Sequence, residues 1–181
     1  LTEFGADMVN CLNQAASFGL TKTCKILVPL VDEYMAKGTK DNFTGVVSTA
    51  PFYWQYHQTH YTFARKFVQA FYDRYKLYPS NGAECAYVNM LVYKRAVERA
   101  QSTEPAKLIP ILETMQWNST KGPEHFRKED HQGVNSVLVV EGVPEADRGA
   151  DGFGFAKVLE EHNGPGVMAP LEGLSCKMET A

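Results

Sequence analysis

The stretch that decides the fold runs from Lys25 to Trp54. Its first part, Lys25-Ile-Leu-Val-Pro-Leu-Val31, is apolar and ends in the acidic pair Asp32-Glu33. Its second part, Gly45-Val-Val-Ser-Thr-Ala50, runs directly into Pro51-Phe-Tyr-Trp54. Short apolar runs bounded by polar or turn residues predict buried strands. This stretch therefore predicts two strands of one sheet.

An amphipathic helix is predicted in front of the first strand. Met8, Leu12 and Ala15 recur at helical spacing after an Asp7 start, and Gly19 is placed to end the helix. A helix, a buried strand, a loop and a second strand in this order form an α/β unit. The chain is therefore expected to fold as an α/β protein.

The ends of the two predicted strands carry acids and aromatic residues. Asp32 and Glu33 follow the first strand, and Phe52, Tyr53 and Trp54 follow the second. In open α/β sheets the carboxyl ends of strands are where small ligands bind, because loops and helix N-termini converge there with unpaired backbone groups. These residues predict one wall of a ligand cleft.

Length and charge restrict the class of protein. The 181 residues, 44% of them apolar, are enough for one large domain or two small ones. The net charge is −3 and the 18 Lys and Arg residues are scattered, which argues against a nucleic-acid partner. No apolar run approaches the roughly 20 residues that cross a bilayer. The start, Leu1-Thr-Glu-Phe-Gly, predicts a processed chain or a fragment.

The cysteines predict disulfides rather than a metal site. Cys11, Cys24, Cys85 and Cys176 show no Cys-x-x-Cys spacing, so a structural zinc site is not expected. One or two disulfides suit an oxidising compartment, and the sequence does not choose among the pairings. Cys11 lies on the predicted helix, where a free cysteine in the core is the alternative.

The rest of the chain predicts three helices followed by strands. An aromatic stripe between Tyr61 and Tyr75 predicts a packing helix that ends before Pro79, and two further helices are expected from about Glu84 to Ala100 and from Glu104 onward. Residues 117–123 have turn composition, and residues 135–143 and 153–160 predict strands. The helical middle thus separates two parts of one sheet, so the chain is expected to cross between two lobes twice.

Several segments resemble a known family when they are taken in order. Residues 4–20 are similar to a "Gly-x-Asp … Gln-Ala-x-x-x-Gly" helix; their sequence is Phe4-Gly-Ala-Asp-Met-Val-Asn-Cys-Leu-Asn-Gln-Ala-Ala-Ser-Phe-Gly-Leu20. Residues 45–54 are similar to a lobe-crossing strand. Residues 67–75 resemble a "Phe … Phe … Tyr" helix, residues 86–100 the next helix, and residues 126–132 an "Arg-x-x-Asp-His-Gln" turn. The family is that of the type I periplasmic solute-binding proteins of ABC transporters, specifically the branched-chain amino acid (Leu/Ile/Val-binding) group and its relatives for amides, urea and aromatic acids.

This resemblance covers only the C-terminal half of a family member. It implies parts of two Rossmann-like lobes joined by hinge crossings, with residues 1–50 in the second lobe, 51–130 in the first, and 131–181 in the second lobe and a C-terminal tail. It further implies a small-molecule ligand, a membrane permease as partner, a periplasmic or extracellular location and no cofactor. The missing N-terminal half, or a second copy, is expected to cover an exposed sheet edge and apolar face.

Asp32 is the first candidate ligand residue. A carboxylate at a strand end can pair with a ligand ammonium or amide in a partly desolvated cleft. The alternative is a solvated loop acid. The resemblance implies an acid near this point, but a slip in alignment of a residue or two places Leu30 there instead, which would argue against an α-amino ligand.

The other candidates are aromatic or lie at a helix start. Phe52 and Trp54, with Tyr53 between them, have faces that suit an apolar or aromatic ligand, and packing of the hinge is the alternative. Cys85 and Tyr87 lie near the start of a helix that the resemblance places beside the cleft, with core packing as the favoured alternative.

No motif indicates catalysis. Gly-x-Ser-x-Gly, Gly-x-Gly-x-x-Gly and Walker loops are absent from the sequence. His57 and His60 have helical spacing for a metal, but no third ligand follows and a polar helix start explains them better. The sequence therefore predicts a binding protein rather than an enzyme. The alternative is a ligand-sensing domain of a receptor or regulator with the same fold.

Overall fold

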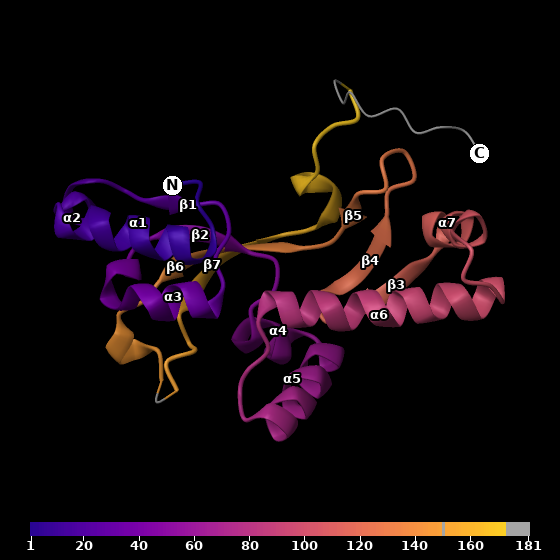
Figure 1. The fold of residues 1–181 in the computed structure, drawn as a ribbon, viewed down its shortest axis with the longest axis horizontal. Coiled ribbons are helices and arrows are strands. Elements are labelled where there is room, and N and C mark those ends of the chain that lie inside the picture. The colour runs from indigo at the N-terminus through magenta and orange to yellow at the C-terminus, as the bar shows by residue number, and fades with distance from the viewer. Residues whose placement is uncertain (150, 173–181) are drawn as a thin grey trace.

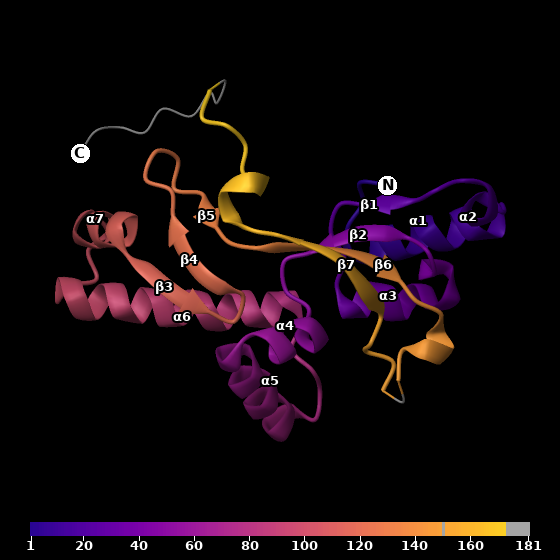
Figure 2. The ribbon, with the colours of Figure 1, turned by 180° about the vertical axis from the view of Figure 1, so that it is seen from behind.

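The computed structural model describes residues 1–149 and 151–172. Two groups of elements lie side by side and are joined by extended segments (Figure 1). The view from behind shows strands β6 and β7 leaving the first group as long ribbons that reach toward the second (Figure 2). The chain therefore passes between the groups three times, once after β2 and once along each of these strands.

The first group contains a four-stranded mixed sheet. Its strands lie in the order β1-β2-β6-β7, with β1 parallel to β2 and the other neighbours antiparallel. The register shifts between Val139 and Val140, where β6 and β7 form an irregularity. The elements are α1 (Gly5–Ser17), α2 (Leu20–Thr23), β1 (Leu27–Val28), α3 (Glu33–Thr39), the 3-10 helix η1 (Lys40–Phe43), β2 (Val47–Ala50), β6 (Val137–Gly142), η2 (Glu145–Asp147) and β7 (Ala156–His162). The 3-10 helix η3 (Gly164–Val167) follows β7 and lies beside β5 of the second group, where Gly164 approaches Val134.

The second group contains the helical middle of the chain and a small antiparallel sheet. Its strands lie in the order β3-β4-β5. The elements are α4 (Trp54–His60), α5 (Thr62–Tyr75), α6 (Asn81–Ala100), α7 (Pro105–Thr114), β3 (Gln116–Ser119), β4 (Gly122–Phe126) and β5 (Gly133–Val134).

Two apolar cores hold these elements. In the larger core, one face of the four-stranded sheet packs against α1 and α3, because alternate residues of each strand point the same way. Leu138 and Val140 of β6 are fully buried on that face, beside Met8 and Leu12 of α1. Side chains of α4 and α5 extend this core. The smaller core joins α6 to the three-stranded sheet through Val88, Val92, Met115 and Trp117.

Local chemistry fixes several helix starts. The Asp32 carboxylate accepts a hydrogen bond from the Met35 backbone at 2.8 Å and caps α3, and the Ser80 hydroxyl accepts from Ala83 at 3.2 Å and caps α6. Pro105 occupies the first position of α7, where its missing N–H is no loss. Gly19 adopts a φ of 74° between α1 and α2, so the first helix ends where expected.

The α/β fold class is confirmed, and four local predictions need correction. The strand expected over 25–31 is only Leu27–Val28, since Pro29 follows at once and has no N–H for a ladder. The loop expected after it is the helix α3. The crossing strand expected over 45–54 is paired only over Val47–Ala50, and the helix α4 begins at Trp54. The turn expected at 117–123 is the β3–β4 hairpin.

Candidate functional site

The two candidates after β1 lie in the connection to α3. Leu30 and Asp32 are both half-buried. One carboxylate oxygen of Asp32 is already used, because it accepts the helix-capping bond from Met35 at 2.8 Å. Within residues 1–149 and 151–172 the other oxygen makes no hydrogen bond. A half-buried capping carboxylate is well fixed in orientation, as a ligand residue has to be.

Phe52 and Trp54 are buried among other aromatic rings. Phe52 stacks on His57 with ring centroids 5.0 Å apart and meets Phe67 edge-on at 6.2 Å. Trp54 stacks almost parallel on Tyr78, with a centroid separation of 3.5 Å and an interplanar angle of 3°. Both rings therefore pack within the protein, and their role as ligand residues stays a prediction.

Cys85 and Tyr87 lie in the first turns of α6. Cys85 is half-buried, its thiol lies 3.7 Å from the Asn81 side-chain oxygen, and burial is the main cause that raises the pKa of this thiol. Tyr87 stacks on Phe67 with centroids 4.7 Å apart and is 39% exposed. Phe67 thus contacts both Phe52 and Tyr87, and it brings these two candidates into one aromatic series.

Glu33 was not predicted to be buried. It is 1% exposed, and among the described residues neither of its carboxylate oxygens has a hydrogen-bond partner. Desolvation is the largest cause that raises the pKa of this carboxyl to about 8, with Asp32 adding to the effect. Glu33 is therefore protonated at neutral pH. The sequence signal that could have found it is the spacing of Met35, Ala36 and Thr39, which with Glu33 form the inner face of α3.

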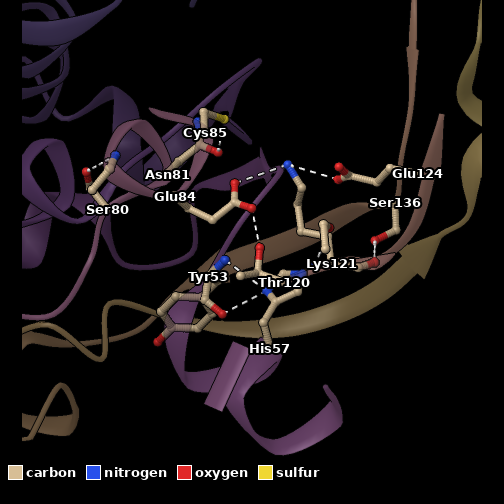
Figure 3. Close-up of polar contacts among 12 residues, drawn as sticks. Tyr53, His57, Ser80, Asn81, Glu84, Cys85, Thr120, Lys121, Glu124 and Ser136 are labelled. Atoms are coloured by element: carbon tan, nitrogen blue, oxygen red, sulfur yellow. Dashed lines mark hydrogen bonds and ion pairs between the residues drawn. The ribbon is translucent and has the colours of Figure 1, made fainter. Parts of the chain in front are cut away.

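A buried polar cluster lies where α6 meets the β3–β4 turn and the start of β6. We call it the polar junction and define it by Glu84, Thr120, Lys121, Glu124 and Ser136. All five residues are buried, and Figure 3 shows their side chains converging from separate elements. Sequence reasoning missed this cluster, since its members are up to 52 positions apart and match no motif.

Lys121 is the centre of the polar junction. Its ammonium lies 3.1 Å from Glu84 and 3.4 Å from Glu124. Burial lowers the pKa of the Lys121 ammonium, but the two carboxylates outweigh this cost and the pKa is raised overall. Thr120 donates to the other oxygen of Glu84. The second carboxylate, Glu124, also accepts from the Trp117 indole at 2.9 Å. Lys121 is therefore charged in the folded protein.

A second polar contact lies beside the junction on the crossing strand β7. Tyr56 and Tyr61 donate to the two oxygens of Glu161 at 2.8 and 2.9 Å. Burial alone would raise the pKa of the Glu161 carboxyl, but these two hydrogen bonds hold it below its ordinary value. Tyr61 also packs against the β3–β4 turn, because a Cβ added to Gly122 would lie 3.0 Å from its ring.

His57 is fully buried between these groups. Its Nδ1 lies 2.9 Å from the Tyr53 carbonyl, and its Nε2 has no hydrogen-bond partner within the described part of the chain. Desolvation is the main cause that lowers the pKa of His57 to about 4. His57 is buried whereas His60 is exposed, and the Nδ1 of each ring lies within hydrogen-bonding distance of a backbone carbonyl. Over residues 1–149 and 151–172, no group of three or more His, Cys, Asp or Glu side chains is placed to hold a metal ion.

Large apolar residues are exposed in both groups of elements. Leu27 on the edge strand β1 is 65% exposed, and Met90 on α6 is also 65% exposed, between the half-exposed rings of Tyr87 and Tyr93. The outer face of the four-stranded sheet carries Val47 and other half-buried residues above a groove of about 390 Å³. Cys11 and Cys24 are exposed rather than in the core, and Cys176 lies outside the described residues.

The family model for periplasmic binding proteins matches residues 1–150. The chain belongs to the periplasmic binding protein family. None of the helices in the described part of the chain is long and apolar enough to cross a membrane. No curated protein matches the sequence.

Solved structures share the fold of this family member. The leucine-, isoleucine-, valine-, threonine- and alanine-binding protein from Brucella ovis, in a closed conformation, matches with a TM-score of 0.81 and 17% identity over 99% of this chain and 46% of its own. The amino acid ABC transporter substrate-binding protein from Pseudomonas fluorescens matches with a TM-score of 0.76 and 22% identity, over 89% of this chain and 43% of its own. A solute-binding protein of an ABC transporter from Rhodopseudomonas palustris, in complex with 3,4-dihydroxybenzoic acid, matches with a TM-score of 0.71 and 21% identity, over 91% of this chain and 46% of its own.

The chain spans less than half of each of these structures. It therefore has a partial type I periplasmic binding protein fold, and the expected resemblance is confirmed. The sequence identities to these structures are all below 25%, so the structural similarity establishes the fold alone.

Proposed function

We propose that this chain is part of a solute-binding protein that captures a small molecule between two lobes and presents it to the membrane permease of an ABC transporter. The observation that carries this proposal is the family match over residues 1–150, together with the two groups of elements that the chain joins by three extended crossings. The protein performs no chemistry on this account. Its location is the periplasm or the cell exterior.

The expected division into lobes is refined in this proposal. Residues 1–50 and the paired strands β6 and β7 form one lobe, and residues 51–134 form the other, so the three crossings are hinge segments about which the lobes close. The antiparallel pairing of β6 with β7 supports this division, since a paired ribbon can bend as one piece at a hinge.

The ligand class is a small amino acid, an amide or an aromatic acid. Relatives of the fold bear names for both branched-chain amino acid binding and binding of 3,4-dihydroxybenzoic acid. Asp32 is the group in this chain for a ligand ammonium or amide, and Leu30 beside it suits an apolar part. Cys85, Tyr87, Phe52 and Trp54 form the candidate wall contributed by the helical lobe.

The rest of the binding site comes from the part of the protein that this chain does not span. The exposed edge at Leu27 and the apolar stripe around Met90 are surfaces that a further α/β segment would cover. The isolated chain is therefore expected to self-associate or to bind its complementary half. Sedimentation velocity tests this, and a stable, well-packed monomer at high concentration would count against it.

A thermal-shift screen of the longer protein tests the function itself. Amino acids, amides, urea and aromatic acids are added one at a time, and a ligand at about 100 times its Kd stabilises by roughly 2.7 kcal/mol. At least one solute is expected to raise the melting temperature. Tyr87→Ala is expected to weaken that shift, while Tyr75→Ala, an exposed tyrosine at the end of α5 and outside the apolar stripe around Met90, leaves it unchanged. A screen without any shift would contradict the proposal.

A further inference from the structure

The polar junction connects a helix of the proposed cleft to both crossing strands. Glu84 lies in the first turn of α6, one residue from Cys85 and three from Tyr87. It is fully buried and is bound by two neighbours in the β3–β4 turn, Thr120 through its hydroxyl and Lys121 at 3.1 Å. Two charge-assisted contacts at a buried site fix that turn of α6 against the hairpin.

The same hairpin turn is bound to β6. The Ser136 hydroxyl donates to the Lys121 carbonyl at 3.2 Å, and Ser136 immediately precedes β6. Lys121 therefore contacts α6 through its side chain and the entry to a crossing strand through its backbone. Its backbone N–H also donates to Ser119 at 2.9 Å, which holds the turn itself.

The turn also reaches the second crossing strand. Tyr61 packs on Gly122, which has no side chain to prevent the close approach, and the Tyr61 hydroxyl donates to Glu161 of β7 at 2.9 Å. A continuous path of contacts, buried at Glu84 and Lys121 and part-buried at Tyr61, thus runs from α6 through 119–122 to β6 and β7.

We propose that Lys121 is a positioning residue for the binding cleft, which makes the first turn of α6, the β3–β4 turn and the start of β6 move as one body when the lobes close. This rests on the proposed function, because it takes the first turns of α6 as cleft wall. Lys121 itself touches no ligand. Its charge is needed because two buried carboxylates share it.

Hydrogen exchange measured by mass spectrometry on the longer protein tests this without any ligand. The charge-balanced double variant Glu84→Gln/Lys121→Met is expected to raise exchange at least about threefold in residues 81–88 and in residues 133–138 together, with little change in residues 89–100. Lys94→Met is the matched control, since Lys94 pairs with Glu98 on the exposed face of the same helix. A change in only one of the two segments, or an equal rise along all of α6, would overturn the proposal.

Ser136→Ala supplies an independent test that leaves every charge in place. It cuts the contact at the β6 end, and the expected result is faster exchange at the other end, in residues 81–88. Unchanged exchange there would also overturn the proposal.

Calorimetry with L-leucine and with 3,4-dihydroxybenzoate separates this inference from the proposed function. If the unaltered protein binds either probe, the double variant is expected to raise the Kd of that probe at least about fivefold, and Lys94→Met is expected to leave it unchanged. An unchanged Kd in the double variant would overturn the positioning role. If the unaltered protein binds neither probe, it is the ligand class of the proposed function that fails, and the exchange results still decide on the junction.

Discussion

Two buried titratable residues have pKa values shifted in opposite directions. Glu33 has its pKa raised to about 8 and His57 has its pKa lowered to about 4, and desolvation is the main cause of both shifts. Each group is therefore neutral in the folded protein at pH 7. Neither role was visible in the sequence, because burial depends on which face of α3 or α4 turns inward.

The Glu33 carboxyl should make stability fall as pH rises. Its folded pKa is above its unfolded value of 4.5, so its stabilising contribution is complete below about pH 4.5 and is lost as pH rises through about 8. Glu33→Gln should remove this dependence. As pH rises from 5 to 9, the free energy of unfolding of the variant should therefore increase by roughly 4 kcal/mol relative to that of the parent protein. Urea unfolding at both pH values measures the difference, with the exposed Glu98→Gln as control. Parallel pH profiles for parent and Glu33→Gln would contradict the burial of this acid.

The His57 ring should resist protonation. Since its folded pKa lies below the ordinary 6.5, the stability it contributes is present above pH 6.5 and is lost as pH falls through about 4. An NMR titration of the ring protons should place the His57 midpoint near pH 4. A midpoint at 6.5 would show that the ring is solvated, which the stacking on Phe52 does not allow.

Long-range contacts decide the arrangement of α6 and the β3–β4 hairpin. The 20-residue helix α6 and the aromatic helix α5 were predictable, because their apolar spacing is regular over several turns. The hairpin was not, since 117–123 is composed of turn residues whose strand pairing depends on Trp117 packing under α6. The short helix α3 was missed because its seven residues carry too little periodicity to separate helix from loop.

Breaking the ion pair between α6 and the hairpin should be costly. Lys121→Met leaves two buried carboxylates without their cation, and we expect a loss of about 3–5 kcal/mol in the free energy of unfolding. Lys94→Met removes an exposed pair on the same helix and should cost less than about 0.5 kcal/mol. Chemical denaturation measures both. Equal losses in the two variants would mean that the junction is solvated.

At the scale of the whole molecule, the order of elements predicted two crossings between lobes, and the structure shows a third along β7. A helical middle inserted between sheet segments has to leave and re-enter the same sheet, and the structure shows this path after β2 and along β6 and β7. The candidate site was only partly predictable. Strand ends predict Leu30 and Asp32 as ligand residues, and this role stays a prediction, whereas Glu84 and Lys121 meet only after separate segments fold together.

Closure of the two lobes on a small solute is the motion that the proposed function requires. Small-angle X-ray scattering of the longer protein, with and without the solute that gives the largest thermal shift, is its most direct test. We predict a smaller radius of gyration with saturating solute, because hinge closure brings the lobes together. A radius that does not change while the solute is bound would contradict capture by closure of the two lobes.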